Sequence, residues 1–105
     1  MPEFVKIAQV GDLSDPGKMI IPVGDRLVVL FCLDQQFYCM DDVCTHDGGT
    51  LGDGELAGCQ IMCPRHGAKF DIRTGEALTM PATENNLTHE VKVEGTDILV
   101  RLGED

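Results

Sequence analysis

The hydrophobic and polar residues of this chain follow the spacing of β-strands rather than of helices. Residues 90–94 alternate between polar and apolar side chains, as in a strand with one buried face. Gly95 and Thr96 then predict a two-residue turn with glycine first, and residues 97–102 a returning strand. Apolar residues do not recur at the three-and-four spacing of a helix over any window of about eleven residues. The pattern therefore predicts an all-β chain that ends in a hairpin.

The N-terminal part of the chain predicts further strands joined by short turns. Residues 26–33 are almost continuously apolar, which is typical of a strand buried on both faces. Other strands are expected over residues 4–10, 18–23 and 37–40, with a polar turn over residues 34–36.

Residues 41–82 differ from both flanks because Gly, Asp and Pro are dense and the predicted strands are brief. These strands cover residues 58–62 and 68–71, and Thr74 and Gly75 follow them as a turn. A framework of strands on both sides can hold such loops rigid at one end of a small sandwich or barrel. With 105 residues, of which 43% are hydrophobic, the chain is expected to form one domain around an ordinary soluble core.

Charge and hydropathy exclude several classes of partner. Eighteen acidic and eight basic residues give a formal net charge of -10, which repels nucleic acid and anionic lipid and attracts basic protein surfaces. The longest apolar run covers residues 27–33, about a third of a membrane-spanning helix. Residues 1–10 do not resemble a secretory signal. We expect no nucleic-acid partner, no membrane association and a cytoplasmic location.

Two short motifs in the loop-rich segment carry candidate metal ligands. Cys44-Thr45-His46 and Cys63-Pro64-Arg65-His66 each place one thiol and one imidazole on a single loop. Two such loops side by side would supply two sulfur and two nitrogen donors. Zinc sites with the same donors usually group the thiols together and the imidazoles together. The mixed pairs therefore favour a 2Fe-2S cluster over mononuclear zinc.

The remaining cysteines and the third histidine leave an alternative open. The chain has five cysteines, an odd number that argues against a secreted disulfide framework. Cys32 is interpreted as a packing residue in an apolar run. A site of four cysteines can also be drawn, although it would leave both motif histidines without a role; its members would be Cys39, Cys44, Cys59 and Cys63. His89, beside an acidic residue, is expected to be solvated.

The two motifs together resemble the Rieske signature, Cys-X-His followed after fifteen to seventeen residues by Cys-X-X-His. The resemblance continues through residues 67–71, Thr74-Gly75 and residues 80–82. It implies one 2Fe-2S cluster, with the two cysteines at an inner iron and the two histidines at an outer, solvent-accessible one; the ligands would be Cys44, His46, Cys63 and His66. The fold implied is a Rieske-like β-sandwich with a smaller loop-rich cluster-binding subdomain. For one domain over residues 1–105, this gives a base of about residues 1–40 and 83–105 and a cluster-binding subdomain of about residues 41–82.

Three positions indicate the type of Rieske protein that the chain resembles. High-potential members carry one further cysteine in each cluster loop and a serine hydroxyl beside the cluster. The corresponding residues here are Gly49, Arg65 and Ala68. Fewer donors toward the cluster imply a reduction potential near the low end of the Rieske range of about -150 to +300 mV. The chain is therefore similar to the stand-alone ferredoxins of bacterial aromatic-ring dioxygenase systems.

This resemblance implies a one-electron carrier rather than an enzyme. Its partners would be a flavin-dependent ferredoxin reductase and a terminal oxygenase, and the chain is expected to be a monomer. Leu51, Met80 and Pro81 would form an apolar docking rim, with Asp47 and Asp53 orienting a basic partner. The alternative is the small subunit or redox-sensing module of another reductase system, such as nitrite reductase.

Overall fold

The fold is nearly all β in a computed structural model that describes residues 3–43, 50–64, 67–80 and 84–103. Within these residues, a short 3-10 helix, η1 (Val10–Asp12), is the one helical element. The strands are β1 (Val5–Gln9), β2 (Gly17–Val23), β3 (Arg26–Leu33), β4 (Gln36–Asp41), β5 (Glu55–Ala57), β6 (Gln60–Met62), β7 (Lys69–Asp71), β8 (Thr88–Glu94) and β9 (Asp97–Arg101). The all-β prediction is therefore confirmed. No helix in the described ranges has the length and apolar character needed to cross a bilayer.

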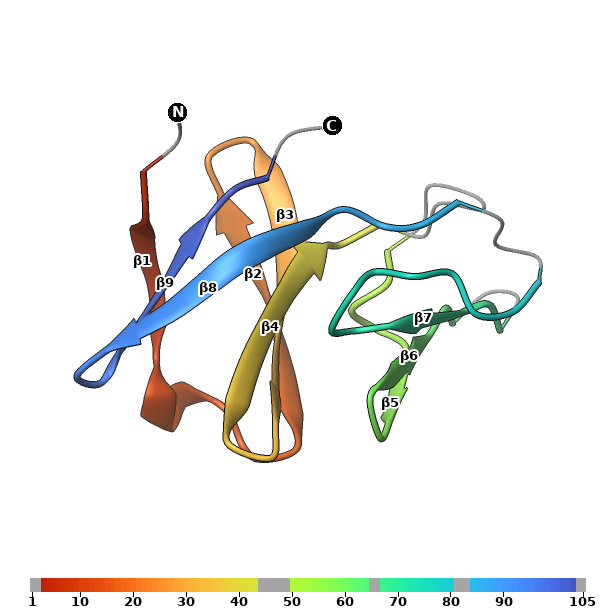
Figure 1. Cartoon of the computed structure of the whole chain (residues 1–105), viewed down its shortest axis with the longest axis horizontal. Coiled ribbons are helices and arrows are strands. Elements are labelled where there is room, and N and C mark those ends of the chain that lie inside the picture. The colour runs from red at the N-terminus through yellow and green to blue at the C-terminus, as the bar shows by residue number, and fades with distance from the viewer. Residues whose placement is uncertain (1–2, 44–49, 65–66, 81–83, 104–105) are drawn as a thin grey trace.

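The larger sheet has six strands in the order β1-β9-β8-β4-β3-β2, and every neighbouring pair is antiparallel. It curls strongly, so that β1 and β9 face β2 and β3 across its interior (Figure 1). Apolar side chains from β1, β3, β4 and β9 fill this interior, which we call the inner core; its buried members are Ala8, Val28, Leu30, Cys39, Ile98 and Val100.

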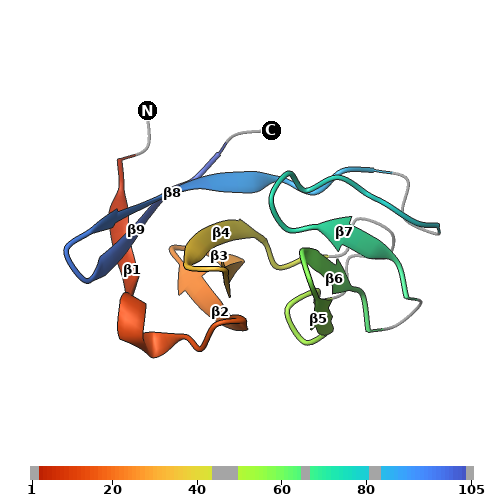
Figure 2. The same cartoon turned by 60° about the horizontal axis from the view of Figure 1, so that its bottom comes forward.

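A smaller sheet in the order β5-β6-β7 packs beside the larger one (Figure 2). Between the two sheets lies a second cluster, which we call the outer core; its buried members are Val29, Phe31, Met40, Leu51, Ile61, Cys63, Ala68, Phe70 and Ile72. Strand β3 contributes alternate residues to the two cores, since Val28 and Leu30 point into one and Val29 and Phe31 into the other. Burial on both faces explains its continuous apolar run, as the sequence predicted.

The turns of the larger sheet show how short connections are made. Gly95 has a φ of 62°, and the β8–β9 turn has the two residues that the sequence predicted. In the β3–β4 turn, Asp34 and Gln35 both adopt positive φ, at 52° and 65°. The carboxylate of Asp15 accepts hydrogen bonds from both of their N–H groups, at 2.9 and 2.8 Å, which offsets the unfavourable backbone conformation. This turn is shorter than predicted, because β4 already begins at Gln36.

The loop-rich segment differs from the prediction in three details, one of which is that β7 begins at Lys69 rather than at residue 68. Strand β5 was not predicted, since its three residues, Glu-Leu-Ala, lack the length that a pattern needs. Strand β6 begins at Gln60 rather than at residue 58, because Gly58 has a φ of 59° and belongs to the β5–β6 turn.

Candidate metal centre

The structure describes one of the four predicted ligands, Cys63, whereas Cys44, His46 and His66 lie outside the described residues. Cys63 follows β6 directly, and its side chain is buried in the outer core. Its N–H donates to the Ala68 carbonyl at 2.7 Å, and its own carbonyl accepts the Gly67 N–H at 3.1 Å. Gly67 has a φ of 77°, a conformation that favours glycine. Backbone hydrogen bonds of Cys63 with Gly67 and Ala68 therefore join the two ends of the second motif.

The first motif lies between two stems that the Asp42 carboxylate ties together. Asp42 is buried, and its Oδ1 atom accepts the N–H groups of Leu51 and Gly52 at 2.9 and 2.6 Å. Gly52 has no room for a side chain, because an added Cβ would lie 2.5 Å from Cγ1 of Ile20. Lys18 Nζ also donates to the Gly52 carbonyl at 2.6 Å, which fastens the second stem to β2.

The stems of the two motifs meet in the outer core. Leu51, at the end of the first motif's loop, and Cys63, at the start of the second, belong to the same buried cluster. Gly54 lies so close to β6 that an added Cβ would be 1.8 Å from the Met62 carbonyl oxygen. Two loops that each carry one thiol and one imidazole thus start from adjacent points of a rigid framework. This arrangement and the donor set fit a 2Fe-2S cluster.

The other cysteines are placed away from a common metal site. Cys39 lies in the inner core, apart from Cys63 in the outer core, so the four-cysteine alternative is not supported. Burial, with a smaller effect of the Asp41 carboxylate, raises the pKa of the Cys39 thiol to about 12. Burial and the Asp15 carboxylate also raise the pKa of Cys32, which is buried as predicted. Across the described ranges, no group of three or more His, Cys, Asp or Glu side chains is arranged to bind a metal ion.

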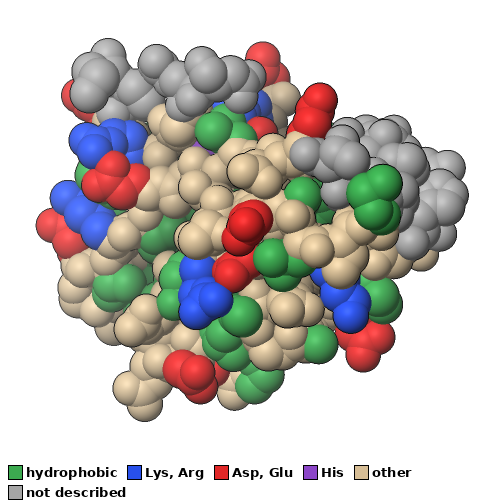
Figure 3. Space-filling view, turned by 45° about the vertical axis from the view of Figure 1, so that its right-hand side comes forward, with side chains coloured by type: hydrophobic (Ala, Val, Ile, Leu, Met, Phe, Trp, Pro, Cys, Tyr) green, Lys and Arg blue, Asp and Glu red, His purple; other side chains and the backbone are tan. Residues whose placement is uncertain are grey.

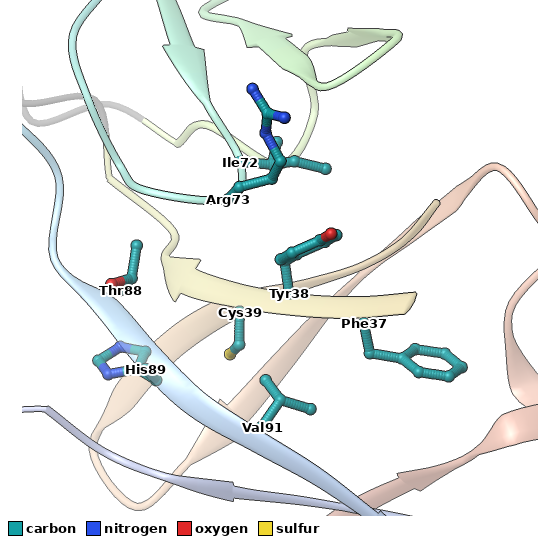
Figure 4. A pocket seen from close by; sticks show the side chains of 8 residues that line it. All are labelled: Phe37, Tyr38, Cys39, Ile72, Arg73, Thr88, His89 and Val91. Carbon is teal, nitrogen blue, oxygen red and sulfur yellow. The ribbon is translucent and has the colours of Figure 1, made fainter. Parts of the chain in front are cut away.

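The prediction that His89 is solvated was wrong. Its side chain is fully buried, and its Nε2 atom lies 2.7 Å from Oδ1 of Asp41. The Gly103 N–H donates to Nδ1 at 2.9 Å, so Nε2 carries the ring proton and donates it to the carboxylate. Figure 4 shows the reason: His89 and Cys39 point to one side of the sheet, while Tyr38 and Thr88 point to the other. The pairing of β4 with β8 therefore turns His89 inward.

The expected docking rim is only partly supported. Leu51 has no exposed surface and belongs to the outer core, so its assignment to the rim was wrong. Met80 is 75% exposed and Leu78 is 38% exposed. Asp53 is exposed, whereas Asp47 and Pro81 lie outside the described residues. Figure 3 shows apolar, acidic and basic side chains interspersed on the face in view.

Comparison with protein families identifies the class. Residues 3–93 match the model of the Rieske [2Fe-2S] domain, and the chain belongs to this family. It carries one 2Fe-2S cluster and acts as an electron carrier, a ferredoxin, rather than as an enzyme.

Three curated relatives are ferredoxin components of dioxygenase systems. The chain is 39% identical over 90 residues to the ferredoxin component of the naphthalene 1,2-dioxygenase system of Pseudomonas aeruginosa, covering 78% of this chain and 86% of the relative. The corresponding Pseudomonas putida protein is 30% identical over 100 residues, with 95% and 96% covered. The ferredoxin subunit of 3-phenylpropionate/cinnamic acid dioxygenase from Escherichia coli K12 is 36% identical over 92 residues, with 80% and 87% covered. These relatives do not favour a nitrite reductase subunit or a sensor.

Solved structures show the same fold. The ferredoxin of carbazole 1,9a-dioxygenase from Nocardioides aromaticivorans IC177 has a TM-score of 0.91 and 26% identity, covering 95% of this chain and 98% of that one. A chain in a complex of reduced oxygenase and oxidized ferredoxin of carbazole 1,9a-dioxygenase has a TM-score of 0.90 and 28% identity, with 97% of each chain covered.

Proposed function

We propose that this ferredoxin carries single electrons from a flavin-dependent reductase to the terminal oxygenase of an aromatic-ring dioxygenase system. The observation that carries the proposal is similarity over most of the chain to ferredoxin components of such systems. Further support comes from the fold shared with a chain of an oxygenase–ferredoxin complex. We expect the protein to be a cytoplasmic monomer.

We propose Cys44, His46, Cys63 and His66 as the ligands of the cluster, with the cysteines on one iron and the histidines on the other. When bound, the cluster supplies a one-electron redox couple. Burial of Cys63 in the outer core supports its place at the inner iron, because it keeps water from that side of the site. The division into a base and a subdomain over about residues 41–82 is also proposed, and the separate β5-β6-β7 sheet supports it.

We propose that the partner proteins dock beside the cluster loops through basic surfaces. Leu78 and Met80 supply exposed apolar contacts, and Asp53 is an exposed acidic residue at the end of the first motif's loop. A net charge of -10 speeds the encounter with a basic surface, and this attraction weakens as the salt concentration rises. Such steering suits a carrier, which must associate and leave quickly.

The direct test is electron transfer in a reconstituted system. The holoprotein should contain two iron atoms and two labile sulfides, show a Rieske electron paramagnetic resonance (EPR) spectrum when reduced, and be reduced by a flavin reductase with NADH. An oxygenase with its aromatic substrate should then reoxidise it on the timescale of turnover. A protein with one zinc, or a cluster that no oxygenase reoxidises, would contradict the proposal.

The ligand assignment needs its own variants. Cys63→Ser should abolish or remodel the Rieske spectrum, and so should His46→Ala, because an open position admits water to iron. Cys59→Ser is the matched control, since Cys59 is a half-buried cysteine of the same subdomain that is not assigned as a ligand. An unchanged spectrum in Cys63→Ser, or a lost one in Cys59→Ser, would refute the assignment.

A further inference from the structure

Asn86 is a buried amide at the junction of three chain segments. It lies just before β8 and is only 6% exposed. Its Nδ2 atom is 3.0 Å from the carbonyl oxygens of Asp41 and Val43, and 3.4 Å from Met40 Sδ. The two protons of the amide therefore go to two carbonyls on the stem that leads into the first motif.

The side-chain oxygen and the backbone N–H of Asn86 are also engaged, and the bond to the side-chain oxygen fixes the orientation of the amide. Its Oδ1 atom accepts the Leu87 N–H at 2.9 Å, so Nδ2 must face the stem. Its backbone N–H donates to the Gly75 carbonyl at 2.7 Å, which connects it to the turn after β7. Gly75 has a φ of 78°, and an added Cβ would lie 2.3 Å from the Asn86 carbonyl oxygen. Asn86 thus also contacts the cluster-binding subdomain, through Gly75.

Asp41 and Asp42 of this stem are held by several further contacts, whereas the Val43 peptide, which lies nearest to the motif, is held by Asn86. The Asp41 N–H donates to the Leu87 carbonyl at 3.0 Å and the Asp42 N–H to the Leu27 carbonyl at 2.9 Å. Val43 is the residue directly before Cys44, and the carbonyl of its peptide is held by Asn86. The orientation of this peptide determines how the chain enters residue 44.

We propose that Asn86 is a positioning residue for the 2Fe-2S cluster, acting through the Val43 peptide on the approach of Cys44. The proposal rests on the ligand assignment above. Asn86 has no place in the ligand set, and the hydrogen bonds of its side chain go to residues outside the two motifs. Its effect on the cluster is therefore indirect and geometric.

The test replaces Asn86 by Asp in the holoprotein and measures the cluster. In Asn86→Asp an oxygen atom faces the two carbonyl oxygens, so two hydrogen bonds are replaced by repulsion while the size is kept. We expect a changed g-tensor in the EPR spectrum of the reduced cluster. Loss of iron from the oxidised protein to a chelator should be about tenfold faster, the factor that corresponds to about 1.4 kcal/mol.

Two controls separate positioning from charge and from general stability. Asn85→Asp adds the same charge one residue away at an exposed position, so its EPR spectrum and rate of iron loss should match the wild type. Ile98→Ala removes buried volume from the inner core, and it should lower the melting temperature while leaving the EPR spectrum unchanged. A purely structural role would make Asn86→Asp behave like Ile98→Ala.

A wild-type EPR spectrum in Asn86→Asp, with iron loss within twofold of the wild type, overturns the positioning role. Equal effects of Asn85→Asp and Asn86→Asp overturn it too, because charge alone would then explain them. If Asn86→Asp does not fold, Asn86→Ala, which leaves the carbonyls unpaired without adding charge, is judged by the same criteria. Failure of the ligand assignment is distinct, since it would appear as an unchanged Rieske spectrum in Cys44→Ser.

Discussion

His89 and Asp41, forty-eight positions apart in the sequence, are joined by a hydrogen bond of 2.7 Å at the junction of β4 and β8. Arg26 completes the arrangement, because its Nη2 atom donates to both carboxylate oxygens of Asp41 at 3.0 and 2.9 Å. Arg26 Nη1 also lies 3.4 Å from the Gly103 carbonyl oxygen. These contacts fasten β3, β4, β8 and the C-terminal segment at the point where the chain leaves for the first cluster loop.

Asp41→Ala should therefore destabilise the protein strongly. It leaves the buried Nε2 proton of His89 without its acceptor and removes the partner of Arg26, at a cost of about 2–3 kcal/mol. Chemical denaturation should show this loss in the free energy of unfolding. Asp97→Ala is the control, because Asp97 pairs with Lys6 in an exposed ion pair that contributes about 0.5 kcal/mol. Equal effects of the two substitutions would contradict the structural role of Asp41.

The close approach of Gly54 to β6 predicts a second effect. Gly54→Ala would bring a Cβ within 1.8 Å of a backbone oxygen that has no freedom to move without breaking the smaller sheet. We expect a loss of at least about 3 kcal/mol and a low iron content. Gly11→Ala is the control, since nothing lies within 4 Å of its added Cβ. A Gly54→Ala protein with full iron content and the wild-type melting temperature would show that this packing is wrong.

The cysteines should differ in their reactivity. Because the thiolate is the reactive form, the raised pKa of about 12 and the burial of Cys39 should protect it from iodoacetamide at pH 8. Cys59, which is half-buried in the β5–β6 turn, should be alkylated first among Cys32, Cys39 and Cys59. Mass spectrometry of peptides would measure this order, with a denatured sample as the control. Alkylation of Cys39 as fast as Cys59 would refute it.

The raised pKa of Cys39 also makes the stability of the fold depend on pH in the alkaline range. The pKa of Cys39 in the folded protein lies above its ordinary value of 9.0. The protonated thiol therefore stabilises the fold fully below pH 9, and this stabilisation is lost as pH rises toward 12. Cys39→Ala should therefore lose less of its melting temperature than the wild type between pH 9 and pH 10.5. An equal loss in both proteins would assign the alkaline dependence to other groups.

The contact between Asp71 and Arg73 should make the stability of the fold fall as the pH becomes acidic. Arg73 donates to Asp71 from its backbone N–H and from its guanidinium, at 2.8 to 3.1 Å, and this lowers the pKa of the buried carboxyl below 3.8. The ionised carboxylate therefore stabilises the fold fully above pH 3.8, and this stabilisation is lost as the pH falls through the lowered pKa of Asp71. Since Arg73 is half exposed and solvent screens the pair, Asp71→Asn should cost about 1 kcal/mol at pH 7. The melting temperature should fall by about 4–8 °C, and the difference from the wild type should narrow as the pH falls below 4. A difference that stays constant from pH 7 to pH 3 would contradict this account.

Sequence patterns were sufficient where the physical signal is local. The alternation over residues 90–94 and the glycine-first turn predicted the β8–β9 hairpin, because side chains in a strand point to opposite faces at every step. The apolar run of β3 predicted burial on both faces. The paired Cys and His motifs indicated an iron–sulfur protein, since the spacing of ligands along a loop is written in the sequence itself.

The tertiary structure alone decided which distant residues meet. His89 was expected in solvent, and Leu51 at a docking rim, because neither the β4–β8 pairing nor the outer core can be read from neighbouring residues. Asn86 carried no signal, although its amide reaches Val43 across forty-three positions of sequence. The order of the strands depends on which apolar faces bury one another. This burial depends on many contacts between residues far apart in the chain. The sequence by itself thus predicted most of the strands and indicated the chemistry of the motifs, whereas packing between the two sheets determined how the stems of the loops are held.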